Sequence, residues 1–217
     1  MNISKPKAVI FDWDNTLIDA WPCILDSYNF TFRHFDMPEW SLEEGKRNIA
    51  RSLRDSFPEM FGDRWKEARE VYYRGFEAAH LERLSPFEGA ATLLETLVAD
   101  GLYVGVVSNK LGKFLREEAK HLDWNRWFGA LVGATDADRD KPDPAPVLMA
   151  LANSGITDHS QVWFVGDSAI DLECATLSGC VPVLMRPEPP GPGEFAPYPP
   201  SLHVENPRHF LHIYDQV

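Results

Sequence analysis

The chain lacks most features that mark a secreted, membrane-bound or nucleic-acid-binding protein. It has three cysteines, Cys23, Cys174 and Cys180, an odd number without metal-ligand spacing, so we expect reduced thiols and a cytoplasmic protein. We find no apolar run long enough for a signal peptide or a membrane span. Basic residues are the minority, 21 against 33 acidic ones, and the net charge of -12 argues against nucleic acid or an anionic membrane as a partner.

Internal repeats and heptad patterns are also lacking, which excludes repeat architectures and coiled coils. What the chain does have is a hydrophobic content of 44%, enough to form a core and to exclude intrinsic disorder. Its 217 residues fit one large domain or one domain with an insert.

Residues 19–84 have a helical pattern throughout. Aromatic and aliphatic residues recur at spacings of three and four, and no strand pattern interrupts them. Pro38 and Pro58 are expected to break these helices. The predicted helical stretches run from Trp21 to Phe35, from Ile49 to Phe57 and from Trp65 to Ala79.

From residue 85 onward, predicted helices alternate with predicted strands. Such alternation indicates a parallel sheet with helices on both faces, a doubly wound, Rossmann-like α/β core. We assign 1–18 and 85–217 to this core, with 19–84 as an inserted helical domain. Seven prolines between Pro187 and Pro200 predict an irregular surface loop. The predicted strands are 8–11, 102–107, 130–133, 161–165, 181–185 and a short edge strand at 202–204.

Two aspartates, Asp12 and Asp14, follow the apolar run 8–11. Residues two apart on an extended strand point the same way, so we expect both carboxylates to face one pocket. Burying them is costly unless they bind a hard cation such as Mg²⁺ or carry out chemistry. Their repulsion raises one pKa, so that one carboxylate stays ionised while the other can hold a proton. Helix capping is the alternative, but the position after a buried strand and before Thr16 favours a functional pair.

Asp167 and Asp171 form a second acidic pair, which follows Gly166 at the end of another predicted strand. Four residues apart on the first turn of a predicted helix, they share one face. Capping of that helix is the structural alternative. If the two strands are neighbours, Asp167 joins Asp12 on one cation.

Ser108-Asn109 and Lys141 are candidates for binding an anion. A hydroxyl and backbone N–H groups at a strand-to-helix turn can hold an oxyanion or a phosphate, or simply cap the helix. Lys141 lies in the sequence Asp-Lys-Pro-Asp-Pro, and the prolines stiffen its turn. It can neutralise phosphate charge or pair with a carboxylate, whereas an isolated lysine is usually solvated.

In this order, the D-x-D-x-T, S-N, K-P and G-D-x-x-x-D motifs resemble those of the haloacid dehalogenase superfamily. The resemblance covers the whole chain, and the insert at 19–84 looks like the helical cap of the phosphoglycolate phosphatase-like subgroup. It implies Asp12 as nucleophile and Mg²⁺ ligand, with Asp14 as general acid/base and main-chain ligand. Ser108 and the Asn109 backbone would hold the phosphoryl oxygens, and Lys141 would bind the phosphoryl group and act as a catalytic residue that stabilises it during transfer. Asp167 would bind Mg²⁺, and Asp171 would support the metal shell or Lys141.

These roles describe a Mg²⁺-dependent phosphatase that acts on a small phosphorylated metabolite, phosphoglycolate-like or a sugar phosphate, through an aspartyl phosphate. A dehalogenase or phosphonate hydrolase is disfavoured by the acid at Asp14, and a sugar-phosphate mutase by Thr16. A phospho-acceptor signalling domain is the alternative from another class, but such domains are shorter and lack a cap. The substrate and the oligomeric state stay open.

Two further features bear on this resemblance. Asn15 stands where the family usually has glycine, and we expect the turn to survive because asparagine tolerates left-handed backbone. In the insert, Arg47, Arg51 and Arg54 recur at helical spacing beside Lys46, which predicts one basic face. A solvated helix face is the simple interpretation; the alternative is that one of them binds an anionic part of the substrate by a forked hydrogen bond.

Overall fold

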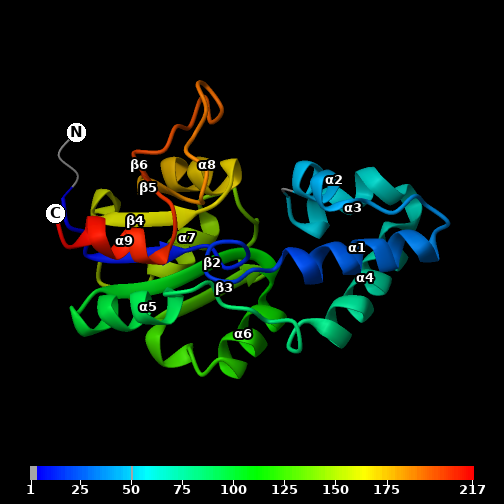
Figure 1. Cartoon of the computed structure of the whole chain (residues 1–217), viewed down its shortest axis with the longest axis horizontal. Coiled ribbons are helices and arrows are strands. Elements are labelled where there is room, and N and C mark those ends of the chain that lie inside the picture. Colours follow the sequence, from blue (N-terminus) through cyan, green and yellow to red (C-terminus); the bar gives the residue numbers. More distant parts are fainter. Residues whose placement is uncertain (1–3, 50) are drawn as a thin grey trace. The chain divides into compact units, whose positions relative to one another are not determined.

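The structure is a computed structural model that describes residues 4–49 and 51–217 (Figure 1). The chain forms two compact units. One contains the residues up to Ile18 together with Pro86–Val217, and the other contains Asp19–Ser85. The second unit is therefore an insert in the sequence of the first, and its role as a cap stays a prediction.

A six-stranded parallel sheet, counted over the described residues, forms the centre of the first unit. The strand order is β3-β2-β1-β4-β5-β6, so β1 lies between β2 and β4. All four residues of β1 are buried, as expected for a strand covered on both faces. The predicted doubly wound α/β class is confirmed. The strands are β1 (Ala8–Phe11), β2 (Tyr103–Leu111), β3 (Ala130–Ala134), β4 (Val162–Gly166), β5 (Val181–Met185) and β6 (Leu202–Val204).

Alternate residues of β1 pack against helices on opposite faces of the sheet. Ile10 belongs to a buried cluster with residues of α7 (Ala145–Leu151) and α8 (Ala169–Leu177). Phe11 contacts Phe210 of α9 (Pro207–Tyr214) on the other face, with ring centroids 5.9 Å apart. The remaining helices of this unit are α5 (Ala90–Ala99), α6 (Gly112–His121), η2 (Asn125–Trp127) and η3 (His159–Gln161).

The end of β2 differs from the prediction. We expected the strand to stop at Val107, but it continues to Leu111, so Ser108 and Asn109 lie within it. The pairing of β2 with β3 changes register between Val107 and Leu111, so the strand continues through an irregularity. The apolar pattern of the sequence does not predict this irregularity. Asp12 and Asp167 do follow β1 and β4 directly, as predicted.

The inserted unit is helical in its described residues, and its core is aromatic. Tyr28 contacts Phe32, Phe57 and Tyr72 at centroid distances of 5.9, 5.7 and 5.2 Å. These rings come from three helices, so the unit has a hydrophobic core of its own. The elements are α1 (Trp21–His34), α2 (Leu42–Asn48), α3 (Leu53–Phe61), η1 (Gly62–Arg64) and α4 (Trp65–Ala79).

Three predictions within the insert are wrong. Pro58 was expected to break a helix but lies inside α3, where buried Phe57 next to it anchors the helix despite the lost backbone hydrogen bond. The basic face does not form on one helix, because Arg47 lies in α2, Arg54 lies in α3, and Arg51 lies between the two helices. The predicted helical stretch from Ile49 to Phe57 is not continuous either, because Ile49 follows the end of α2 and α3 begins only at Leu53.

The proline-rich loop and the cysteines agree with expectation. Residues 187–200 contain neither helix nor strand, although Phe195 and Tyr198 pack on the buried side chains of Leu172 and Leu184. Burial raises the pKa of Cys174 and of Cys180 to about 12, and both thiols are free. Over the part of the chain that the structure describes, no helix is both long enough and apolar enough to cross a membrane.

Candidate active site

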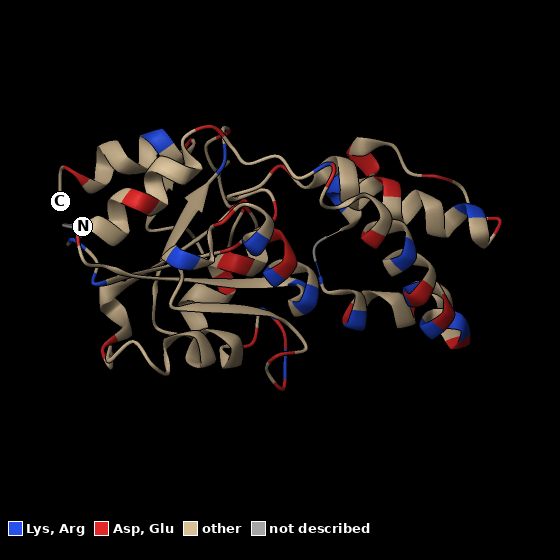
Figure 2. Ribbon diagram, turned by 90° about the horizontal axis from the view of Figure 1, so that it is seen from below, with Lys and Arg blue, Asp and Glu red and all other residues tan. Residues whose placement is uncertain are grey.

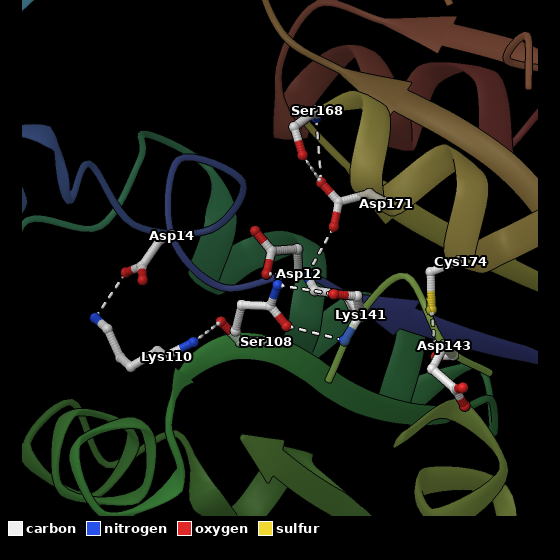
Figure 3. A network of polar contacts seen from close by, with 10 residues as sticks. Asp12, Asp14, Ser108, Lys110, Lys141, Asp143, Ser168, Asp171 and Cys174 are labelled. Carbon is white, nitrogen blue, oxygen red and sulfur yellow. Dashed lines mark hydrogen bonds and ion pairs between the residues drawn. The ribbon is translucent and has the colours of Figure 1, made fainter. Parts of the chain in front are cut away.

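Asp12, Lys141 and Asp171 form one buried group at the carboxyl end of the central strands (Figure 3). β1 places Asp12, and the first turn of α8 places Asp171. The Lys141 Nζ atom lies 2.7 Å from Asp12 Oδ1 and 2.7 Å from Asp171 Oδ1. The predicted fixed lysine is therefore paired with two carboxylates, and only 2% of it is exposed.

Asp167 completes an acidic cluster around Asp12. α8 begins at Ala169 after its N-cap Ser168, so Asp167 precedes the helix and does not share its first turn with Asp171, contrary to the prediction. The strand end nevertheless brings it to the site. One carboxylate oxygen from each of Asp12, Asp167 and Asp171 lies within 4.8 Å of the others.

This cluster has the charge and the donor atoms that suit a divalent cation. Burial raises the pKa of Asp12 to about 7; Lys141 opposes the rise, while Asp171 and Asp14 add to it. Burial, reinforced by Asp171 and Asp12, also raises the pKa of Asp167 well above its ordinary value. Ionised carboxylates at this spacing need positive charge beyond one lysine, and their hard oxygen atoms are ligands that Mg²⁺ prefers.

Asp14 pairs with a different lysine. The Lys110 Nζ atom lies 2.6 Å from Asp14 Oδ1 and 2.6 Å from Glu118 Oε2. Burial raises the pKa of Asp14, although Lys110 pulls in the opposite direction. Burial also works against the Lys110 ammonium, but Asp14 and Glu118 outweigh it and raise its pKa. The two aspartates of the D-x-D motif are thus held by separate lysines, although we expected one shared pocket.

Ser108 and Asn109 of β2 contact the backbones of the two lysines. The Ser108 hydroxyl accepts a hydrogen bond from the Lys110 backbone N–H at 3.2 Å, which leaves its own proton to donate elsewhere. The Asn109 side chain binds the backbone of Lys141 twice: Nδ2 donates to the carbonyl at 3.2 Å, and Oδ1 accepts from the N–H at 3.0 Å. Phosphate binding by Ser108 and by the Asn109 backbone stays a prediction.

The turn after Asp14 adopts the backbone expected of it. Asn15 has a φ of 62°, in the left-handed region that the family's usual glycine would occupy, so asparagine preserves the turn. Leu17 and Ile18 N–H groups both donate to the Trp13 carbonyl, which closes the turn. Thr16 is 1% exposed, and its hydroxyl has no hydrogen-bond partner among the described residues.

A family model matches most of this chain. The model for haloacid dehalogenase-like hydrolases matches residues 9–184, which include all the site residues above. The chain belongs to this family. The predicted family membership, Rossmann-like fold and enzyme class are confirmed at this level.

Two curated relatives and one solved structure illustrate the range of the haloacid dehalogenase-like family around this chain. Pyrophosphatase PpaX of Bacillus velezensis is 27% identical over 213 residues, 98% of each chain. Phosphoglycolate phosphatase of Photorhabdus laumondii is 25% identical over 182 residues, 80% of this chain and 77% of the relative. A haloacid dehalogenase-like hydrolase of Streptococcus pneumoniae has the same fold, with a TM-score of 0.84 at 20% identity over 97% of this chain and 99% of that one.

Sequence reasoning missed Glu118 and the part that Lys110 plays beside it. A signal for Glu118 was present: it lies on the face of α6 that also carries buried Phe114 and Leu115. Burial of a carboxylate on an apolar helix face is costly unless a charged or hydrogen-bonding partner is buried beside it. The partner could not be named, because Trp13 and Lys110 reach it only through the tertiary structure.

Proposed function

We propose that this haloacid dehalogenase-like hydrolase is a Mg²⁺-dependent phosphatase, which hydrolyses a small phosphorylated metabolite through an aspartyl phosphate on Asp12. The pairing of Asp12 with Lys141 at 2.7 Å inside the acidic cluster carries this proposal. A nucleophilic carboxylate needs adjacent positive charge to approach a phosphate dianion, and the lysine supplies it.

Each residue has a part in two displacements. An Asp12 carboxylate oxygen attacks phosphorus, and the bond to the leaving oxygen breaks. Lys141 and the Ser108 hydroxyl stabilise the charge on the phosphoryl oxygens. Asp12, Asp167 and the main-chain carbonyl of Asp14 would hold Mg²⁺, with Asp171 beside them, and the bound ion supplies further charge neutralisation.

Asp14 serves as the acid and then as the base. Burial raises its pKa, which favours the protonated form, and this proton goes to the leaving oxygen. As a carboxylate, it then takes a proton from the water that attacks the phosphorus of phospho-Asp12. The products are inorganic phosphate and free Asp12, and Asp14 is protonated again.

The substrate is a small phosphorylated compound, and the relatives indicate which compounds to try first. Phosphoglycolate follows from one set of relatives, and inorganic pyrophosphate from the other. These differ in the leaving group, an alkoxide in one case and a phosphate in the other. A panel of sugar phosphates, phosphoglycolate and pyrophosphate separates them by kcat/KM.

Trapping the intermediate tests the mechanism. With Mg²⁺ and substrate, acid-quenched protein should gain the mass of one phosphoryl group on the peptide that contains Asp12. Asp12→Asn keeps the volume but cannot attack, so kcat should fall more than about 100-fold, roughly 2.7 kcal/mol of barrier. Retained turnover in Asp12→Asn would refute the nucleophile. A phospho-Asp12 that persists for minutes would indicate a signalling domain, and transfer of the phosphoryl group to a second sugar hydroxyl would indicate a mutase.

A further inference from the structure

Glu118 is a buried carboxylate that the proposed reaction does not use. It is 1% exposed, on a face of α6 whose other buried side chains include Phe114, Leu115 and Ala119. An apolar residue at this position would pack without any cost of desolvating a charge, and buried ion pairs replaced by apolar residues often leave the fold equally stable. The presence of a carboxylate here therefore calls for a reason other than stability.

Its contacts lead to the D-x-D segment by two routes. Glu118 Oε2 accepts a hydrogen bond from Trp13 Nε1 at 2.7 Å, and Trp13 lies between Asp12 and Asp14 in the chain. The same oxygen lies 2.6 Å from Lys110 Nζ, and Lys110 Nζ also lies 2.6 Å from Asp14 Oδ1. Glu118 is thus tied to the backbone segment that carries Asp14 and, through Lys110, to the Asp14 carboxylate.

Lys110 is also fixed at its backbone, where its N–H donates to the Ser108 hydroxyl. The proposed phosphate-binding serine and the lysine that holds Asp14 are therefore two residues apart on one strand. Trp13 is fully buried against Trp124 and Phe128, at centroid distances of 5.8 and 6.1 Å, so the route through Trp13 is also rigid. Both routes therefore restrict where Asp14 can lie relative to Ser108.

The structure contains the same motif twice. Asp12 pairs with Lys141, which pairs with Asp171; Asp14 pairs with Lys110, which pairs with Glu118. In each case a second carboxylate holds the lysine that holds the aspartate. A lysine is a long, flexible side chain, and one contact would leave its ammonium mobile.

We propose that Glu118 is a positioning residue, which acts through Lys110 to hold the Asp14 carboxylate where it meets the leaving oxygen. This inference rests on the proposed function, since it requires Asp14 to protonate a leaving group. Loss of the Glu118 carboxylate removes a contact that fixes the Lys110 ammonium, so that the ammonium and the Asp14 carboxylate paired with it can shift. Displacement of a catalytic group by about 1 Å can cost as much as about 100-fold in rate.

The leaving group provides the test. Departure of an alkoxide needs a proton, whereas departure of 2,4-dinitrophenolate does not, so only the alkyl ester needs the proton of Asp14 to form the phosphoenzyme. Hydrolysis of phospho-Asp12, in which Asp14 acts as the base, is common to both esters and follows the steps that determine kcat/KM. We expect Glu118→Gln and Lys110→Met to lower kcat/KM for phosphoglycolate, or for the best alkyl phosphate of the panel, at least about tenfold. With 2,4-dinitrophenyl phosphate both variants should stay within about threefold of wild type.

A double-mutant cycle tests the route through Lys110. In the Lys110→Met background, Glu118→Gln should change neither rate more than about twofold, because the path to Asp14 is already broken. Trp13→Phe removes only the hydrogen bond from Trp13 to Glu118. It should lower kcat/KM less than Glu118→Gln does, with the same dependence on the leaving group. Glu117→Gln removes one charge from the neighbouring position of α6 and should leave both rates unchanged.

The outcomes separate this inference from the proposed function. Wild-type protein that hydrolyses neither ester would refute the proposed function and the role of Glu118 with it. With an active wild type, an equal loss on both esters in Glu118→Gln, or no loss on either, would refute the positioning role alone. Additive effects in the double-mutant cycle would likewise refute the route through Lys110.

Discussion

At the scale of single residues, Asn109 connects the proposed phosphate-binding strand to the lysine beside the nucleophile. Its side-chain amide makes both hydrogen bonds that the Lys141 peptide offers, across 32 positions of the chain. Lys141 carries its ammonium into a pocket of two carboxylates, so the backbone position of this lysine determines the ion-pair geometry. Asn109 therefore matters for its side chain as well as for its backbone N–H.

Asn109→Ala should lower kcat about tenfold or more and the free energy of unfolding by about 1–3 kcal/mol, because the partly buried Lys141 peptide loses two partners. Steady-state kinetics and urea unfolding measure the two effects. Asn125→Ala, at an exposed position, is the matched control and should change neither. Unchanged kcat in a destabilised Asn109→Ala protein would show that the clamp serves the fold alone.

The sequence predicts some of these residues and not others, for a physical reason. The D-x-D pair, the stiff turn at Lys141 and the left-handed turn at Asn15 are local features, and local propensity is enough to find them. The contact between Trp13 and Glu118 joins residues 105 positions apart. No local pattern specifies such a pair until the order of the strands is known.

At the scale of elements, the junction of β4 with α8 determines where Asp171 lies. Ser168 caps α8, and Asp171 returns the contact: its Oδ2 accepts from the Ser168 N–H at 3.1 Å and from the Ser168 hydroxyl at 2.6 Å. Its Oδ1 remains for Lys141. Gly166, the last residue of β4, permits this close approach, because a Cβ there would lie 2.3 Å from Asp171 Cβ and Cγ.

Gly166→Ala should therefore displace Asp171 and lower kcat about tenfold or more, with a stability loss of about 1–3 kcal/mol from overpacking. Gly191→Ala is the control, since a Cβ there would meet its nearest atom, Glu194 Oε2, at 3.5 Å. Kinetics with phosphoglycolate and thermal unfolding distinguish the two variants. A Gly166→Ala protein with wild-type kcat would show that the Lys141–Asp171 contact is dispensable.

Element boundaries follow the sequence wherever burial dictates them. β5, β6 and α9 begin and end where the apolar pattern predicts, because an apolar run or face coincides with the hydrogen-bonded element. β2 runs past its apolar run because pairing with β3 resumes at Leu111 after an irregularity. α3 continues through Pro58 because tertiary packing of its neighbour Phe57 overrides propensity.

At the scale of the whole molecule, the inserted unit contributes charge as well as a second core. Figure 2 shows basic and acidic residues interspersed along its helices. Arg51 is engaged by Glu59 in a forked pair, with contacts of 3.1 and 2.5 Å. Lys46 and Arg47, at the end of α2, are exposed. Arg47 is therefore a better candidate than Arg51 for an anionic substrate group.

Arg47→Ala should raise KM for phosphoglycolate several-fold and leave kcat/KM for 2,4-dinitrophenyl phosphate nearly unchanged, because only the first substrate carries a carboxylate. Arg33→Ala, which breaks the exposed pair with Glu39, is the control within the same unit. If KM stays at the wild-type value in Arg47→Ala and also in the Lys46, Arg51 and Arg54 variants, the cluster has no contact with substrate. Specificity would then be sought around Asp19 and Pro22.

The acidic cluster also links the stability of the whole protein to pH and to Mg²⁺. The pKa of Asp12 rises on folding from 3.8 to about 7. Between these values the folded protein binds more protons at Asp12 than the unfolded chain does. Without metal, the contribution of Asp12 to the free energy of unfolding is therefore complete below about pH 4 and is lost as the pH rises to about 7. A cation that binds the ionised carboxylates competes with those protons, so it stabilises more at higher pH.

Mg²⁺ should accordingly raise the melting temperature more at pH 7.5 than at pH 5. At a free concentration 100 times Kd the gain is about 2.7 kcal/mol, which corresponds to roughly 5–10 °C for a chain of this size. Differential scanning calorimetry with Mg²⁺ and with a chelator measures it without reference to activity. Asp167→Asn should lose most of the shift, and Asp138→Asn, at an exposed acidic position, should keep it. An equal shift at both pH values, or an undiminished shift in Asp167→Asn, would place the Mg²⁺ site elsewhere in the protein.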